Sequence, residues 1–376
     1  MTCPKCGLMQ LPGPRCKSCG AALTSPSGDP SPTRPSSLEK TATPPSPELP
    51  TRPSRPPQDA GAASQSRRPS FHGTGWSLFS IHIVNTFLTI ITLGIYYFWG
   101  KVKVRSYLLS QSEFEGDRFA YHGTGKELLV GFLKALVAFG IPLVLLGILR
   151  ELLTSRPVLN GLLVLLTYLI FLALIPFAIV GARRYRLSRT SWRQIRFSFR
   201  GQAMDFIRLF VWGSLLTTVT LGIYYPFFET HRHGFLVSHS YFGNQRFDFD
   251  GRGRDLFRRF LLAVLLFVPT LGLSWVWYLA RKQRYFWQHT TFASARFHST
   301  VTGGRLFLLM AGNLLLLLVT FGLGWPWAMV RNVRFAFRYL TVEGPLDLAG
   351  IQQEAQTASA TGEALAGFLD AGLDIG

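Results

Sequence analysis

The chain has 376 residues, of which 48% are hydrophobic, 14% are aromatic and only 16% are charged, and its formal net charge is +19. A nucleic-acid-binding protein can share this charge, but it does not concentrate Leu and Val in apolar runs of transmembrane length. High hydrophobicity combined with strong basicity and many aromatic residues is typical of a membrane protein with basic and aromatic surface layers. The composition therefore predicts a membrane protein and excludes nucleic acid as the expected partner.

The four cysteines of the chain stand in two C-x-x-C-G knuckles near the N-terminus: Cys3, Cys6, Cys16 and Cys19. Each knuckle lets two thiolates converge on one ion, and the glycine permits the tight turn that follows. Four thiolates complete a tetrahedral site, so residues 1–22 are predicted to form a zinc ribbon with structural Zn²⁺. Two disulfides or an iron–sulfur site are the alternatives. No apolar signal sequence stands in the first seventy residues, so we expect a cytosolic, reducing environment for the N-terminus.

Residues 23–70 are rich in Pro, Ser, Thr and Ala, and they are predicted to be a disordered linker because they cannot bury enough apolar surface to fold. The membrane domain is predicted at 71–342 and a mobile C-terminal tail at 343–376. Within the membrane domain, six segments are long enough to cross a hydrocarbon core of ~30 Å. These hydrophobic segments are 78–99, 128–149, 158–180, 206–228, 257–280 and 305–329.

One pattern recurs along the membrane domain and predicts internal repeats. Thr-Leu-Gly at 92–94 reappears at 220–222 and 270–272, and as Thr-Phe-Gly at 320–322. Between the apolar segments, arginines precede Phe-x-Phe alternations such as Phe247–Phe249, which predict short strands with one apolar face. The predicted fold is a polytopic α-helical membrane protein built from ~50-residue repeats, each pairing an apolar helix with a short basic and aromatic strand segment.

A longer motif extends the first of these tripeptides. The stretch Thr92-Leu-Gly-Ile-Tyr-Tyr-Phe-Trp-Gly-Lys-Val-Lys-Val-Arg105, with Phe119-x-Tyr-His-Gly-Thr-Gly125 downstream, resembles the YjgN-like bacterial inner-membrane proteins, a family assigned to a domain of unknown function. The resemblance covers about residues 70–342 and implies a polytopic protein of the bacterial inner membrane. It implies no settled activity, cofactor or catalytic residue. The predicted zinc ribbon lies outside the shared region and is an addition in this chain.

Few polar side chains interrupt the apolar segments. Asn85 and Asn313 occupy the same repeat position, and Lys134 lies one to two turns into its segment. An inter-helical hydrogen bond is the simplest role for the asparagines, and a polar site facing a substrate path in the membrane interior is the alternative. Three histidines after the fourth segment are interpreted as an interfacial cluster and not as a metal site: His231, His233 and His239. No arrangement typical of a catalytic site is recognised, so the chain is predicted not to be an enzyme.

The basic connectors predict contact with anionic lipid headgroups, and they also pose a topology problem. Six alternating spans would place strongly basic connectors on both faces, against the positive-inside tendency. We expect six spans, and the alternative is that the single segments re-enter the membrane while only 128–180 crosses it as a hairpin. The predicted function is a membrane scaffold, sensor or assembly factor that presents a cytosolic zinc ribbon to a protein partner. A transporter or channel for a small solute or lipid is the alternative.

Overall fold

The computed structural model describes residues 66–346, 348 and 350–353, all of which belong to one compact unit, Ala60–Gly376. The predicted zinc ligands Cys3, Cys6, Cys16 and Cys19 lie outside the described residues, as do almost all of the predicted linker and much of the predicted tail.

The described helices and strands follow one another in five similar groups, each with two helical arms that form a hairpin and lead into strands. A short strand precedes the first group, β1 (Ser70–Phe71). The first group is α1 (Gly75–Ile91), α2 (Tyr97–Ser110), β2 (Ser112–Phe114) and β3 (Asp117–Tyr121). The second is α3 (Gly125–Ala135), the π-helical turn η1 (Leu136–Gly140), α4 (Ile141–Leu152), α5 (Pro157–Arg189), β4 (Thr190–Trp192) and β5 (Ile195–Phe199). The third is α6 (Ala203–Val219), α7 (Tyr225–Ser238), β6 (Ser240–Phe242) and β7 (Gln245–Phe249). The fourth is α8 (Gly253–Leu265), α9 (Leu273–Gln288), β8 (Thr290–Phe292) and β9 (Ala295–Ser299). The fifth is α10 (Gly303–Val319), α11 (Trp325–Arg338) and β10 (Leu340–Glu343).

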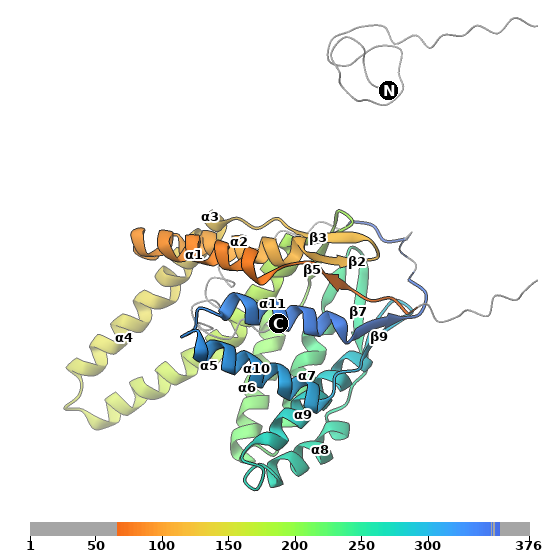
Figure 1. The fold of residues 1–376 in the computed structure, drawn as a ribbon. Coiled ribbons are helices and arrows are strands. Elements are labelled where there is room, and N and C mark those ends of the chain that lie inside the picture. The colour runs from red at the N-terminus through yellow and green to blue at the C-terminus, as the bar shows by residue number, and fades with distance from the viewer. Residues whose placement is uncertain (1–65, 347, 349, 354–376) are drawn as a thin grey trace, which may run out of the picture. The chain divides into compact units, whose positions relative to one another are not determined.

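The strands form one antiparallel sheet in chain order from β1 to β10. Its two edges meet, because Arg67 N donates to Val342 O (2.9 Å) and Val342 N donates to Arg67 O (2.8 Å). We call the closed sheet the strand ring. Figure 1 shows the strands gathered together, with the helical hairpins running away from them.

The helical hairpins are joined in a closed circle by one recurring contact. The second helix of each group packs against the first helix of the next, and α11 packs against α1 in the same way. At four of these joints an aromatic ring occupies the space beside the glycine that begins the next helix, where a Cβ would not fit. The pairs are Trp99 with Gly125, Phe227 with Gly253, Trp277 with Gly303 and Trp327 with Gly75. The last pair joins the final group to the first.

Three arginines reinforce the joints by reaching the loop that enters the next group. Arg184 donates to Gly201 O (2.7 Å), Arg284 to Val301 O (2.8 Å) and Arg334 to Gly73 O (2.9 Å). The Arg334 bond spans most of the described chain. The joint that closes the circle therefore uses the same chemistry as the joints between groups adjacent in sequence.

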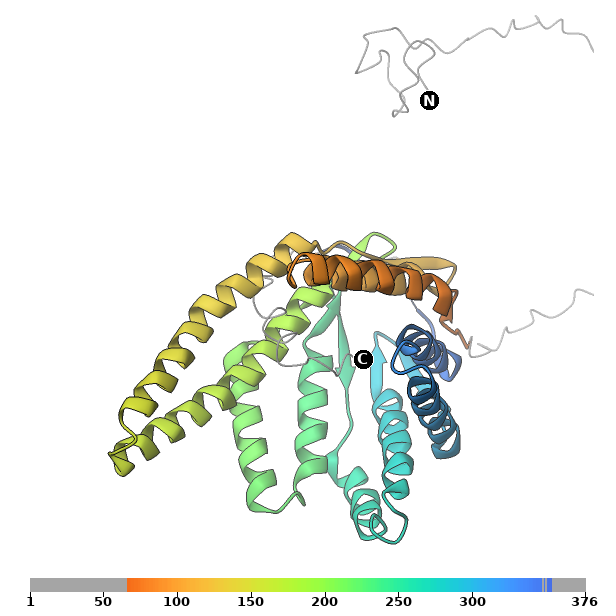
Figure 2. The same cartoon turned by 60° about the vertical axis from the view of Figure 1, so that its left-hand side comes forward.

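The structure differs from the expected six continuous helices. In the segment 78–99, α1 ends at Ile91 and α2 begins at Tyr97, and the segments 206–228, 257–280 and 305–329 are interrupted in the same way. The reason is the Thr-apolar-Gly tripeptide, whose second and third residues have positive φ (50° at Leu93 and 93° at Gly94) and reverse the chain. Two described helical stretches are long and apolar enough to cross a membrane, Gly125–Leu152 and Pro157–Arg189. They form the separate yellow to light-green arm in Figure 2.

The glycine joints can be tested with two neighbouring residues. Gly303 faces the Trp277 ring, whereas a Cβ at Gly304 would meet nothing within 4 Å. Gly303→Ala should therefore destabilise the fold by about 1–3 kcal/mol through overpacking, and Gly304→Ala should be neutral or slightly stabilising. The measurement is the thermal unfolding midpoint in mild detergent. If Gly75→Ala, which crowds Trp327, behaved like Gly304→Ala, the circle would not close as described.

Candidate functional site

The interior of the strand ring is filled by aromatic side chains. Phe-x-Phe alternation places the aromatic residues of each strand on one face and the arginines on the other. Trp192, Phe242 and Phe292 are buried at the centre, and partly buried rings pack against them. These surrounding residues are Phe114, Phe119, Ile195, Phe197, Phe247 and Phe297. We call this set the aromatic core of the strand ring.

The aromatic core is held by contacts between successive groups. The Phe197 and Phe242 rings are 4.8 Å apart and the Phe247 and Phe292 rings 4.6 Å apart, each pair joining neighbouring strand hairpins. Trp192 Nε1 donates to the carbonyls of Phe114 and Asp117, both at 3.2 Å. Because the buried indole N–H has partners, the tryptophan can occupy the centre without an unsatisfied donor.

Residues that follow β10 cover this core. Leu346, Leu348 and Ile351 pack against it. Ser294 donates to Pro345 O (3.1 Å), and the Arg196 N–H donates to Gln353 Oε1 (2.6 Å). This part of the predicted mobile tail is thus placed against the ring, which it covers with apolar side chains.

A buried ionic cluster lies between α7 and α9. Glu229 is 8% exposed and forms two ion pairs: its Oε2 lies 2.9 Å from Arg232 Nη2, and its Oε1 lies 3.2 Å from Lys282 Nζ. Burial acts to raise the pKa of Glu229, but the two cations outweigh it and hold the pKa below its ordinary value. Removing one partner of such a cluster would leave an uncompensated buried charge. The cluster therefore stabilises the packing of the α6–α7 hairpin against the α8–α9 hairpin. Glu229 is not among the residues predicted from the sequence, although its position just past an apolar segment and three residues before an arginine is a usable signal.

The three histidines after the fourth predicted segment have separate environments. The ring of His233 stacks on Phe286 with 4.1 Å between centroids, whereas His231 is exposed. His239 Nδ1 lies 2.8 Å from Phe235 O, in its own helix. Burial, together with the cation of Arg183, lowers the pKa of His233 to about 4, so that ring is neutral at pH 7. Among the described residues, no group of three His, Cys, Asp or Glu could hold a metal ion.

The predicted polar residues of the membrane interior lie in three different helices. Asn85 Nδ2 donates to Gly100 O (3.3 Å), and Asn313 Nδ2 donates to Asn332 Oδ1 (2.7 Å), each within its own hairpin. Lys134 is exposed on α3. The asparagines thus make inter-helical hydrogen bonds, the simpler of the two roles considered for them, and a shared substrate path stays a prediction.

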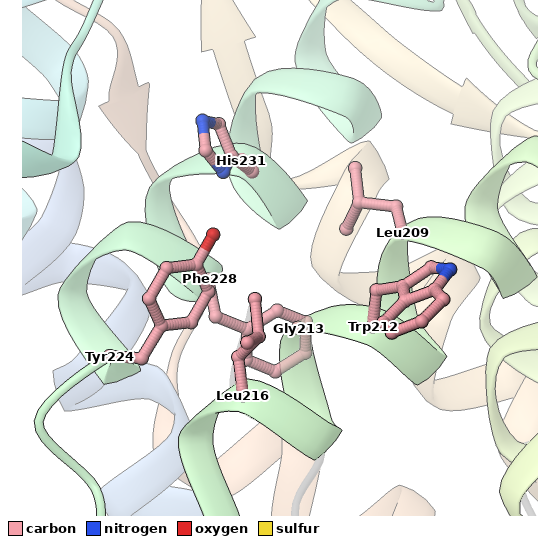
Figure 3. A pocket seen from close by; sticks show the side chains of 7 residues that line it. All are labelled: Leu209, Trp212, Gly213, Leu216, Tyr224, Phe228 and His231. Carbon is pink, nitrogen blue, oxygen red and sulfur yellow. The ribbon is translucent and has the colours of Figure 1, made fainter. Parts of the chain in front are cut away.

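A shallow apolar hollow of about 200 Å³ lies between α6 and α7. It is lined by Leu209, Trp212, Gly213, Leu216, Tyr224, Phe228 and His231. Figure 3 shows His231 at one edge of the hollow. Its lining supplies surface for an apolar chain and contains neither a carboxylate nor a hydroxyl nucleophile other than the tyrosine.

The buried histidine predicts a pH dependence. Between pH 6.5 and about 4 the unfolded chain binds a proton at His233 that the folded chain does not, so stability falls as the pH falls through this window. We expect His233→Phe, which retains the stack on Phe286, to remove about 1–3 kcal/mol of this loss. The measurement is the free energy of unfolding between pH 7 and 5. Glu229 does not contribute to the change in this range, because the stability that its lowered pKa provides is lost only as the pH falls below its ordinary value of 4.5. His231→Gln, on the exposed side, should keep the slope of the native chain; an unchanged slope in His233→Phe would contradict the assignment.

Comparisons with known proteins agree with the resemblance found in the sequence. A family model described as bacterial protein of unknown function (DUF898) matches residues 66–275 and 261–368. The inner membrane protein YjgN of Escherichia coli K12 is 33% identical over 152 residues, which cover 40% of this chain and 36% of that protein. YjgN of E. coli O157:H7 is 37% identical over 131 residues, covering 34% and 30%.

YjgN of Salmonella typhimurium is 35% identical over 130 residues, covering 35% of this chain and 30% of that protein. The matched parts therefore span about a third of the length of these relatives. No solved structure matches the chain. The family match covers most of the chain and all of the strand ring, and the chain belongs to the DUF898 family of bacterial proteins of unknown function.

Proposed function

We propose that this chain is a non-enzymatic protein of the bacterial inner membrane that holds a cytosolic zinc ribbon at the membrane surface for a protein partner. Relatives of the chain are named inner membrane proteins, and two described helical stretches are long and apolar enough to cross a bilayer. The family match begins at residue 66, so the predicted zinc ribbon is an attachment to the shared domain.

The observation that carries the proposal is the way in which the N-terminal region joins the strand ring. Arg67 pairs with Val342 through two main-chain hydrogen bonds, and its guanidinium lies 2.7 Å from the carboxylate of Glu115. The chain that leads from the predicted zinc ribbon therefore ends in the wall of the ring. A Pro-rich linker of the predicted kind spans about 3.1 Å per residue, so the ribbon would stay within reach of the membrane domain.

The outer face of the strand ring supports placement beside anionic headgroups. Exposed arginines occur at matching strand positions in four groups: Arg118, Arg196, Arg246 and Arg296. Each basic residue close to an anionic membrane surface contributes about 1 kcal/mol of binding. The ring then provides a rigid, lipid-bound base from which the zinc ribbon is presented.

The zinc ribbon is tested by replacing Cys3, Cys6, Cys16 and Cys19 with Ser in the full chain. The native protein should contain one zinc per chain by elemental analysis, and the variant none. Proteins that co-purify with the native chain in mild detergent should be lost from the variant, because a site of four thiolates folds only with its metal. Ser18→Ala, which changes the knuckle without removing a ligand, serves as the control. Retention of every co-purifying protein by the cysteine variant would exclude the zinc ribbon as the partner site.

A transporter or channel is the second candidate, and one observation favours it. The side-chain oxygens of Asn85 and Asn313 are buried without a hydrogen-bond partner among the described residues. Such groups are satisfied by water or a polar ligand in most proteins. The test uses proteoliposomes loaded with a mixture of small anions, cations and amino acids, and mass spectrometry measures which solutes leave them. Any flux through the native chain should be lost when both asparagines are replaced by Leu. Absence of flux from the native chain, or flux unchanged in the variant, would count against this candidate.

A further inference from the structure

Four of the helical hairpins end in one kind of turn, made by the Thr-apolar-Gly tripeptides. In the first, Thr92 Oγ1 donates to Leu88 O (2.7 Å) and accepts from Tyr96 N (2.9 Å), and Gly94 N donates to Thr89 O (2.7 Å). The same three bonds, between 2.6 and 3.0 Å long, recur at Thr220, Thr270 and Thr320. The turn thus satisfies main-chain groups that a helix end normally leaves to water. Backbone that reverses direction in hydrocarbon has to meet this condition.

The middle residue of each turn is apolar and almost fully exposed. Leu93 and Leu221 are 93% exposed, and Leu271 and Phe321 are 96% exposed. All four have φ near 50°, in the left-handed region that glycine or asparagine normally fills at the end of a helix. A large apolar side chain in that conformation gains nothing in water, but it removes apolar surface from water when hydrocarbon surrounds it. The chemistry of the turns therefore fits lipid acyl chains.

The distance from each turn to the first charged residue of the second helix limits how deep the hairpin can insert into hydrocarbon. In the second helix of each hairpin the first Lys, Arg, Asp or Glu follows the turn glycine by seven to nine positions: Lys101, Glu229, Arg281 and Arg331. At 1.5 Å per residue this is about 10–14 Å, close to the ~15 Å thickness of one leaflet's hydrocarbon. The long helix of the second group, α5, is different, because no charged residue lies between Arg156 and Arg183, a length of about 40 Å.

We infer that the four short hairpins end inside the cytosolic leaflet, in contact with its acyl chains, and that only the hairpin of α3–α4 and α5 crosses the bilayer. The strand ring and every basic connector between groups then lie on the cytosolic side. The turn at 153–156 reaches the opposite side. This arrangement removes the conflict with the positive-inside tendency that six alternating spans create. The inference rests on the membrane location proposed above, but not on the zinc ribbon or its partner.

Single cysteines in the full chain, with the four native cysteines replaced by Ser, test the arrangement in intact cells. Ser155→Cys, in the crossing hairpin, should react with a membrane-impermeant maleimide from outside. Ser294→Cys, in the turn between β8 and β9, should react only in inside-out vesicles. Leu271→Cys, at a hairpin turn, should react from neither side. Reaction of Leu271→Cys from outside would show a full span and overturn the inference, as would its reaction in inside-out vesicles, which would place the turn in water.

A second measurement gives the depth directly. A bimane fluorophore on Leu271→Cys or Leu93→Cys, reconstituted in phosphatidylethanolamine and phosphatidylglycerol vesicles, should be quenched most by lipids brominated near the end of the acyl chain. Ser294→Cys labelled in the same way should show no preference for deep bromine. Stronger quenching of the turns by shallow bromine would overturn the inference. Recovery of the native chain without membranes in cell fractionation would instead refute the proposed location, and unchanged thermal unfolding of each variant verifies its fold.

Discussion

Four glycines at the beginnings of helices have no room for a Cβ, because a tryptophan or phenylalanine of the preceding hairpin occupies that space. Each of these contacts fixes where one hairpin leaves the strand ring relative to its neighbour. Because these contacts join consecutive groups and the last of them joins the final group to the first, the linear series of groups forms a circle. The Trp327–Gly75 contact shows that the circle closes without a special joint. The aromatic core and the direction of every hairpin depend on this closure.

The sequence supplied the elements of this arrangement but not their geometry. Thr-apolar-Gly was detected as a repeat, and Phe-x-Phe as a strand with one apolar face, and the structure has turns and strands at those places. The turns were mistaken for parts of continuous helices because their exposed residue is Leu or Phe, so the hydropathy of the segment does not fall where the chain reverses. Local patterns also cannot reveal contacts between distant residues. Glu229 and Lys282, or Arg67 and Val342, are joined only by the fold.

Charge is divided between two environments. Acidic residues are scarce, and several of them are used inside the unit: Glu229 in the buried cluster, Glu127 with Arg189, and Glu115 with Arg67. Glu229 neutralises cations where it is buried, since an unpaired buried charge is costly, whereas the other two pairs are partly exposed to solvent. On the outer strand face Arg246 also pairs with Asp248 and Arg296 with Asp250, but over the whole chain 39 Lys and Arg residues outnumber 20 Asp and Glu residues. A single composition thereby supplies both internal ion pairs and an exposed basic surface.

The helical joints are alike, but the contact that closes the strand ring, between Arg67 and Val342, differs from the other strand pairings. Between β9 and β10 four residue pairs are in register, and three are in register at the junctions of β3 with β4 and β5 with β6, whereas Arg67 and Val342 make one isolated pair. Among the residues that the structure describes, fewer residue pairs join Arg67 to β10 than join β9 to β10, and a contact with fewer main-chain bonds opens at a lower free energy. The N-terminal region enters the ring at the closing contact, and the residues that cover the aromatic core leave from it directly after β10. Force on the N-terminal region would therefore act on β10, which the covering residues directly follow.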